Sequence, residues 1–152
     1  MLWLFVLLGH MLVAIALVGA ITHQMVAVVW RRPRRRGFVS RYGAVSAAAF
    51  TNGVIAIYLA AFALGSWLYT DYRYKARPVL EDLGLERAVG FFEMKEHMLA
   101  IGLMLLPAYW YYWRRVPHDR QRVTRAALTL IIGASIWIGL LAGHVTNNAR
   151  GV

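Results

Sequence analysis

Residues 91–113, FFEMKEHMLAIGLMLLPAYWYYW, decide the fold of this chain. The stretch is apolar over most of its length, ends in a cluster of Tyr and Trp residues, and carries charged residues and one histidine at its head: Glu93, Lys95, Glu96 and His97. A run of this length and composition is typical of a helix that crosses a membrane. A charged side chain inside hydrocarbon costs roughly 2.5 kcal/mol or more, so these residues are expected to be paired or functional.

The composition agrees with a membrane protein. The 152 residues are 60% hydrophobic, which is too apolar for an ordinary soluble domain and fits one domain in a lipid bilayer. The net charge of +10 comes mainly from two short basic clusters between apolar runs, where Lys and Arg orient membrane helices rather than bind nucleic acid. Cysteine is absent, which excludes disulfides, thioether-linked haem and Cys-ligated iron–sulfur clusters.

Four apolar runs predict an all-α fold, an integral membrane four-helix bundle formed by a single domain over residues 1–152. The expected helices cover about 2–30, 42–67, 89–113 and 126–146, and the expected loops cover 31–41, 68–88 and 114–125. The first run is followed by basic residues rather than preceded by them, so it is predicted to be an uncleaved anchor. In the polar, Tyr-rich loop a short interfacial helix is expected over 79–87, and Pro107 is expected to kink the third helix.

The distribution of Lys and Arg predicts the orientation in the membrane. The loops 31–41 and 114–125 together hold eleven of these residues, against six elsewhere. By the positive-inside rule these two loops are cytoplasmic. Both termini and the loop 68–88 are therefore expected on the non-cytoplasmic side.

Three histidines are predicted to lie at one level near the outer surface. Counting about 1.5 Å per residue from the inner basic anchors places His10 at about 30 Å, His97 at about 24 Å and His144 at about 28 Å. Each belongs to a different helix. Glu93 shares the face of His97, and Glu96 lies about 100° around the helix from it.

Other polar residues are assigned structural or supporting positions. Tyr58 lies at the same predicted level on the second helix. Thr51 and Asn52 are expected to hydrogen-bond to a backbone carbonyl or to a neighbouring helix. Lys95 is about 200° from His97 and is expected to extend to the membrane interface. His23 lies near the inner side, away from the predicted layer.

This layer is compatible with three kinds of site, and each histidine alone is also explained by ordinary hydrogen bonding. A b-type haem would take two histidines from different helices, with Glu93 or Tyr58 orienting a ligand and glycines such as Gly143 giving room. A non-haem metal site would take copper, zinc or iron. Its candidate ligands are His10, His97, His144, Glu93 and Glu96. A proton path or quinone pocket is the third alternative.

The segments LLGHMLVAIALVGAITHQ, KEHMLAIGLMLLPAYWYYWRR and GLLAGH together resemble small four-helix bacterial membrane proteins of the b-type cytochrome and CopD-like kind. The resemblance rests on hydropathy order and histidine placement. It implies a multi-pass protein of the bacterial inner membrane that carries haem b or handles a metal ion. The candidate ligands that it carries over are His10, His97 and His144.

The sequence thus predicts a membrane-integral electron-transfer subunit with one b haem near the outer face, exchanging electrons with quinone or a partner subunit. One alternative is a non-catalytic accessory subunit of a larger respiratory or transport complex, which binds partner membrane or periplasmic subunits and no cofactor. Another is a membrane protein that handles copper, zinc or iron. In all three the chain is a subunit or carrier rather than a stand-alone enzyme, and no catalytic residue is predicted.

Overall fold

The computed structural model describes residues 2–29, 47–117 and 120–148, without the side chain of Asn147. Within these residues the protein is entirely helical, as predicted. The helices are α1 (Leu2–Val29), α3 (Ala47–Asp71), the π-helix η1 (Tyr72–Ala76), α4 (Arg77–Asp82), α5 (Glu86–Arg114) and α6 (Arg122–Asn148).

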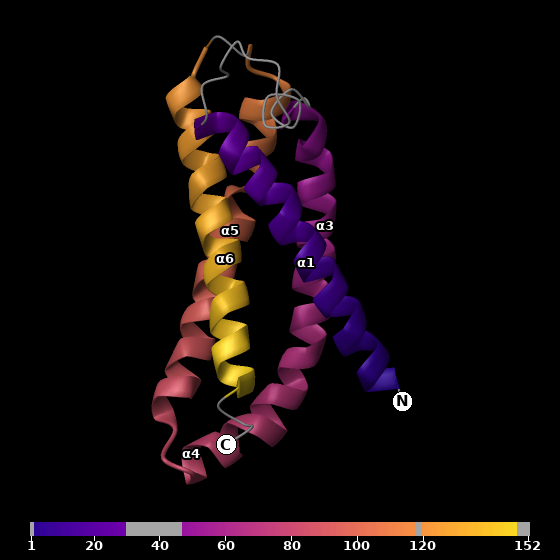
Figure 1. Cartoon of the computed structure of the whole chain (residues 1–152), viewed down its shortest axis with the longest axis vertical. Coiled ribbons are helices and arrows are strands. Elements are labelled where there is room, and N and C mark those ends of the chain that lie inside the picture. Colours follow the sequence, from indigo (N-terminus) through magenta and orange to yellow (C-terminus); the bar gives the residue numbers. More distant parts are fainter. Residues whose placement is uncertain (1, 30–46, 118–119, 149–152) are drawn as a thin grey trace, which may run out of the picture.

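The four long helices pack in a ring. α1 contacts α3, α3 contacts α5, α5 contacts α6, and α6 closes the ring against α1. Figure 1 shows that one end of the elongated molecule contains the first turns of α1, the last turns of α6 and the short helix α4. We call it the α4 end. The last turns of α1 and the first turns of α3 lie at the opposite end.

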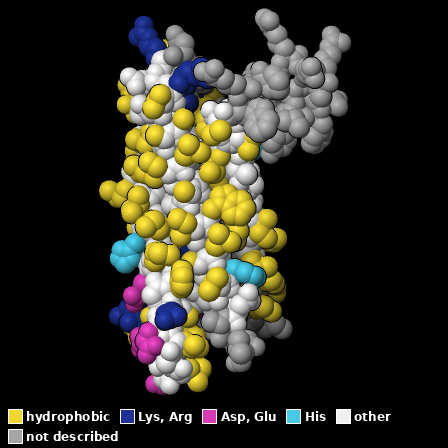
Figure 2. Space-filling view, turned by 60° about the vertical axis from the view of Figure 1, so that its left-hand side comes forward, with side chains coloured by type: hydrophobic (Ala, Val, Ile, Leu, Met, Phe, Trp, Pro, Cys, Tyr) yellow, Lys and Arg dark blue, Asp and Glu magenta, His cyan; other side chains and the backbone are white. Residues whose placement is uncertain are grey.

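Three helical segments are long and apolar enough to cross a membrane: Leu2–Val29, Ala47–Asp82 and Arg122–Thr146. α5 does not meet the same criterion, because charged residues occupy its first third and polar aromatic residues its last turns. Figure 2 shows hydrophobic side chains over the middle of the face in view, with charged side chains at both ends. The protein is thus a helical bundle with three segments that could cross a membrane by length and composition. A fourth span and the sides of the termini stay predictions.

The core forms where apolar residues recur every three or four positions and so share one helix face. α1 contributes Leu17 and Ile21, α6 contributes Ile132 and Ile136, and all four side chains are buried. Large apolar residues are also exposed on the outside, among them Met104. Lipid tails are as apolar as a leucine side chain, so an apolar exterior is expected of a bundle in a bilayer.

The segment 68–88 differs from the loop that its polarity predicted. It is helical except for a turn after α4, and the short helix lies at Arg77–Asp82 rather than 79–87. Gly84 makes the turn with a φ of 70°, a left-handed conformation that favours glycine. The Gly84 N–H bonds to the Glu81 carbonyl at 3.0 Å and the Leu85 N–H to the Leu80 carbonyl at 2.8 Å, a Schellman motif.

This outer segment has a small core of its own. Tyr72, Ala76 and Leu80 recur every four residues and are buried against the first turns of α5, at Ala88 and Val89. The ring of Tyr72 also stacks on Phe92, with centroids 3.6 Å apart. Side-chain packing therefore holds η1 and α4 against α5.

Other boundaries shift by a few residues. α5 begins at Glu86 rather than 89 and continues as a helix through Pro107, and α6 begins at Arg122 rather than 126. The predicted start of the second helix at 42–46 and the loop 31–41 lie outside the described residues.

Candidate functional site at the α4 end

His10 faces the contact between α1 and α3. Its ring interacts with the backbone of Ala61 and lies against Gly65, where a Cβ atom would come within 3.1 Å of the ring carbon Cε1. Gly65 therefore lets the imidazole approach α3. The ring nitrogen Nδ1 is buried and has no hydrogen-bond partner within the described residues. Because buried polar atoms are nearly always paired, this nitrogen is a candidate for contact with a ligand.

The other two predicted ligands bond to their own helices. His97 is exposed, and its Nδ1 lies 2.7 Å from the carbonyl oxygen of Glu93. His144 is also exposed, and its Nε2 lies 3.1 Å from the side-chain nitrogen of Asn148. Among the residues that the structure describes, no three His, Asp or Glu side chains come close enough to hold a metal ion. The described arrangement thus does not support the predicted metal site of His10, His97, His144, Glu93 and Glu96.

Lys95 lies elsewhere than expected. Its side chain is half-buried rather than extended to the interface, and its Cδ passes 4.0 Å from where a Cβ would stand on Gly143 of α6. The ammonium lies 3.8 Å from the centroid of the Phe92 ring, a cation–π contact. The room that Gly143 was predicted to give a haem is used by the lysine stem.

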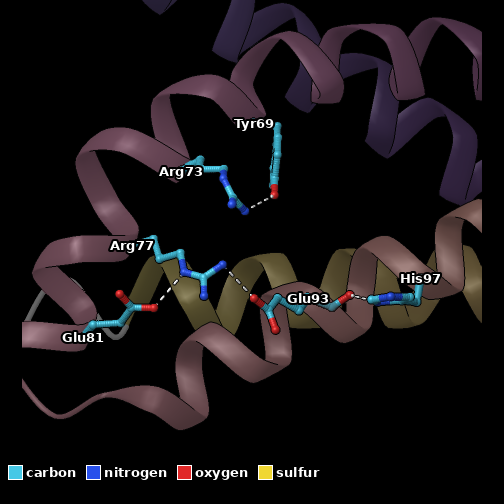
Figure 3. A network of polar contacts seen from close by, with 6 residues as sticks. All are labelled: Tyr69, Arg73, Arg77, Glu81, Glu93 and His97. Atoms are coloured by element: carbon cyan, nitrogen blue, oxygen red, sulfur yellow. Dashed lines mark hydrogen bonds and ion pairs between the residues drawn. The ribbon is translucent and has the colours of Figure 1, made fainter.

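Glu93 connects α5 to α4. Its carboxylate pairs with Arg77 Nη1 at 2.8 Å, while Arg77 Nε pairs with Glu81 at 2.7 Å. Figure 3 shows the Arg77 guanidinium between these two carboxylates, and Glu93 followed one turn later by His97. The Arg77–Glu81 pair has the four-residue spacing of a helical ion pair and was visible in the sequence. The pairing with Glu93 required the fold, because the two residues belong to different helices.

Tyr58 is fully buried between α3 and α5 and does not reach His10 in any contact of the described structure. Its hydroxyl donates a hydrogen bond to the carbonyl oxygen of Leu99 at 2.6 Å. A Cβ at Gly102 would collide with that hydroxyl and with Ser135 Oγ. The space beside Gly102 is therefore filled by Tyr58, whose hydrogen bond joins α3 to α5.

A polar network in the half of the bundle away from α4 was not predicted. Gln24 is fully buried, and its Nε2 donates to the Ala47 carbonyl at 2.7 Å and to Thr51 Oγ1 at 3.4 Å. The Tyr109 hydroxyl donates to Gln24 Oε1. The prediction that Thr51 bonds to a neighbouring helix is confirmed, whereas Asn52 is exposed. The sequence signal for this network was Gln24 itself, an amide side chain inside the first apolar run.

An apolar groove lies between α1 and α3, beside His10. It is lined by Leu12, Val13, Ala16, Ala56, Ile57 and Ala60. Along α1 its lining begins at Leu12, about half a helical turn from His10, and along α3 it ends at Ala60, about one and a half turns from Gly65, in both cases away from the α4 end.

The fold and the side chains at the α4 end define the class: an all-helical protein with segments long and apolar enough to cross a membrane and with partly buried basic side chains, His10 and Lys95, toward one end of its bundle. Comparisons with protein families, characterised proteins and solved structures find no match for the chain.

Proposed function

We propose that this protein is a membrane-embedded accessory subunit of a larger membrane complex, and that it binds a different subunit through the exposed face of η1 and α4. We call this face the α4 surface and define it by Tyr74, Val79 and Leu83. These side chains are 75%, 54% and 67% exposed. The partner expected there is the extramembrane part of another subunit.

The observation that carries the proposal is that segment 68–88 is a fixed helical element rather than a flexible loop. Its own small core and the pairing of Arg77 with Glu93 hold it in place. Large apolar side chains on a fixed element can bind a partner without paying the entropy of ordering a loop. In Figure 1 the segment lies at the tip of the bundle, beyond the long helices.

The proposal is tested by site-specific photocrosslinking in native membranes. A photoreactive phenylalanine analogue replaces Tyr74 in one sample and Tyr111 in the control. Tyr111 is also an exposed tyrosine, but it lies near the far end of α5. A single adduct is expected from position 74, with the partner identified as a membrane-complex subunit by mass spectrometry, and none from position 111.

A second substitution makes the crosslink specific to the α4 surface. Val79→Lys, in the background that carries the crosslinker at position 74, places a charge on the contact and is expected to remove most of the adduct. Absence of an adduct at position 74, or an adduct that Val79→Lys leaves unchanged, would refute the docking role.

A membrane-integral electron-transfer subunit is the second candidate function, and the position of His10 favours it. A b-type haem, when bound, would carry one electron at its iron and exchange it with quinone or a partner subunit. His10 is the residue best placed as a ligand, because its Nδ1 is buried without a hydrogen-bond partner in the described structure. His97 and His144 would have to give up their contacts within α5 and α6 to act as the second ligand.

Spectroscopy separates the two candidates. Protein expressed with ample haem and purified in detergent is expected to show Soret and α bands in a reduced-minus-oxidised spectrum if it is a b-type cytochrome. His10→Ala should then remove these bands. A sample with no bands would exclude the haem, and a stoichiometric content of copper, zinc or iron in it would favour the metal-handling alternative instead.

A further inference from the structure

The charges of this molecule are separated along its length. Of the seven Asp and Glu residues, six lie from Asp71 to Glu96, toward the α4 end, and the seventh, Asp119, lies outside the described residues. Figure 2 shows the same separation on the face in view, with Asp and Glu near the α4 end and Lys and Arg at the other. Around the turn between α5 and α6 lie four exposed arginines, which we call the basic turn: Arg114, Arg115, Arg120 and Arg122. None of them makes an ion pair within the described part of the chain.

A fifth arginine, Arg125 of α6, is buried and fixes the shape of the basic turn. Its Nη2 donates to the carbonyl oxygens of Val116 and Pro117, each at 3.2 Å. Its Nε and Nη2 also donate to the carbonyl oxygen of Tyr112, at 3.1 and 3.0 Å. The Arg120 N–H bonds to the Pro117 carbonyl at 3.1 Å. Because α6 thus holds the end of α5, the exposed arginines can meet a ligand without the cost of ordering a loop.

Aromatic side chains beside the basic turn point to a position at the membrane surface. Trp110 and Tyr111, directly before Arg114 on α5, are 37% and 53% exposed. The guanidinium carbon of Arg115 lies 5.4 Å from the centroid of the Trp110 ring. Trp and Tyr are enriched where a membrane helix leaves the hydrocarbon. The candidate span on α6 begins at Arg122, on the other side of the turn. The four arginines are therefore expected at the level of the lipid head groups.

We propose that the basic turn binds the phosphate groups of anionic phospholipids in the leaflet at this end of the bundle. A guanidinium donates two parallel hydrogen bonds to phosphate oxygens, and each basic residue near an anionic surface strengthens binding roughly fivefold. The described carboxylates lie toward the other end and do not compete for these arginines. An acidic segment of another protein could also pair with them, but the neighbouring Trp110 and Tyr111 favour lipid. The proposal does not depend on the docking role of the α4 surface.

Lipid selectivity of matched charge variants is the direct test. The full-length protein in detergent is titrated with phosphatidylglycerol and, separately, with phosphatidylcholine of the same acyl chains, and binding is followed by native mass spectrometry. Arg114→Gln combined with Arg115→Gln is expected to lower the preference for phosphatidylglycerol about tenfold. The control, Arg73→Gln combined with Arg87→Gln, removes the same charge from exposed arginines near the α4 end and should leave the preference nearly unchanged.

Circular dichroism and gel filtration confirm that both double variants are folded. Two results would overturn the proposal. An unchanged preference in the variant of Arg114 and Arg115 would show that the basic turn does not bind the lipid. An equal loss in both variants would show that the preference follows net charge and not this site. Displacement of phosphatidylglycerol by an equal concentration of inorganic phosphate would also overturn it, in favour of a site for free phosphate.

Photocrosslinking in native membranes identifies the occupant. Val123 is 83% exposed and follows Arg122, so a photoreactive amino acid at this position reports on the basic turn. Val145, an exposed valine near the other end of α6, is the control position. Adducts at position 123 are expected to be enriched in phosphatidylglycerol over those at position 145, and the variant of Arg114 and Arg115 should remove the enrichment. A protein adduct at position 123 would refute the lipid assignment in favour of an acidic partner.

Discussion

At the scale of single residues, several buried side chains hydrogen-bond from one helix to another, among them Gln24, Tyr58 and Trp113. Gln24 is the centre of one network that joins three helices, because its amide both donates to α3 and accepts from α5. Water does not reach a buried amide in an apolar bundle, so it cannot replace a hydrogen-bond partner that is lost. The partners of Gln24 should therefore matter for stability.

Tyr109→Phe is expected to destabilise the protein. The substitution removes the hydroxyl that donates to Gln24 Oε1 and leaves that oxygen buried without its donor. The expected cost is about 1 kcal/mol, the range found for hydrogen bonds between membrane helices. Thermal unfolding in detergent measures it, with Tyr111→Phe as the exposed control. Equal melting temperatures for the two variants would contradict the role of the network.

Gly102→Ala is expected to destabilise the protein. The added Cβ would collide with the Tyr58 hydroxyl and Ser135 Oγ, so the α3–α5 contact must open. Gly53→Ala is the control, because its Cβ would meet nothing and alanine favours a helix by up to about 1 kcal/mol. Melting temperatures should fall for the first variant and stay equal or rise for the second.

The single residues show where sequence reasoning succeeded and where it stopped. The interhelical role of Thr51 followed from its chemistry and its place inside an apolar run. The angle between Lys95 and His97 was also usable, since the two do point in different directions. The sequence could not show which face of α5 packs against the other helices, because apolar residues occur on every face of this helix. His97 therefore lies outside and Lys95 inside, the reverse of the prediction.

At the scale of elements, the segment between α3 and α5 is the one most different from expectation. Its charge and tyrosine content suggested a loop, yet Tyr72, Ala76 and Leu80 carry the four-residue spacing of a buried helix face. That pattern was present in the sequence, but it is short and interrupted by Pro78, which sits in the first turn of α4 where proline is tolerated.

Arg77→Gln is expected to loosen α4 without unfolding the bundle. It removes the ion pairs to Glu81 and Glu93, which are exposed and so contribute mainly to local order. Hydrogen–deuterium exchange should become faster at the backbone amides of 79–85 and stay unchanged in α6. Lys75→Gln is the control within the same segment. The charge swap Arg77→Glu with Glu93→Arg should restore part of the protection, and failure of Arg77→Gln to change exchange would show that packing alone holds the segment.

At the scale of the whole molecule, the number and order of the long helices followed from four apolar runs and the polar segments between them. The predicted layer of histidine ligands stays a prediction, because counting residues gives the depth of a side chain but not the direction in which it points within the bundle. His10, His97 and His144 can share a level and still face different surroundings, as they do here.

The predicted orientation can be tested with single cysteines, since the chain has none. Tyr74→Cys lies at the α4 end, and Arg120→Cys lies between α5 and α6 at the opposite end. A membrane-impermeant maleimide added to intact bacterial cells with a permeable outer membrane should label position 74 and leave position 120 unlabelled until the inner membrane is opened. The reverse pattern would show that the termini are cytoplasmic.

The shared end of α1, α4 and α6 also bears on how the protein should be handled. A fluorescent protein or affinity tag fused before α1 or after α6 would lie at the same end of the molecule as the α4 surface (Figure 1), where its bulk can obstruct a partner. A fusion could therefore yield a well-behaved sample stripped of its partner. A short epitope inserted between Pro117 and Arg120, at the far end of the bundle, would leave that surface clear for isolation of the intact assembly.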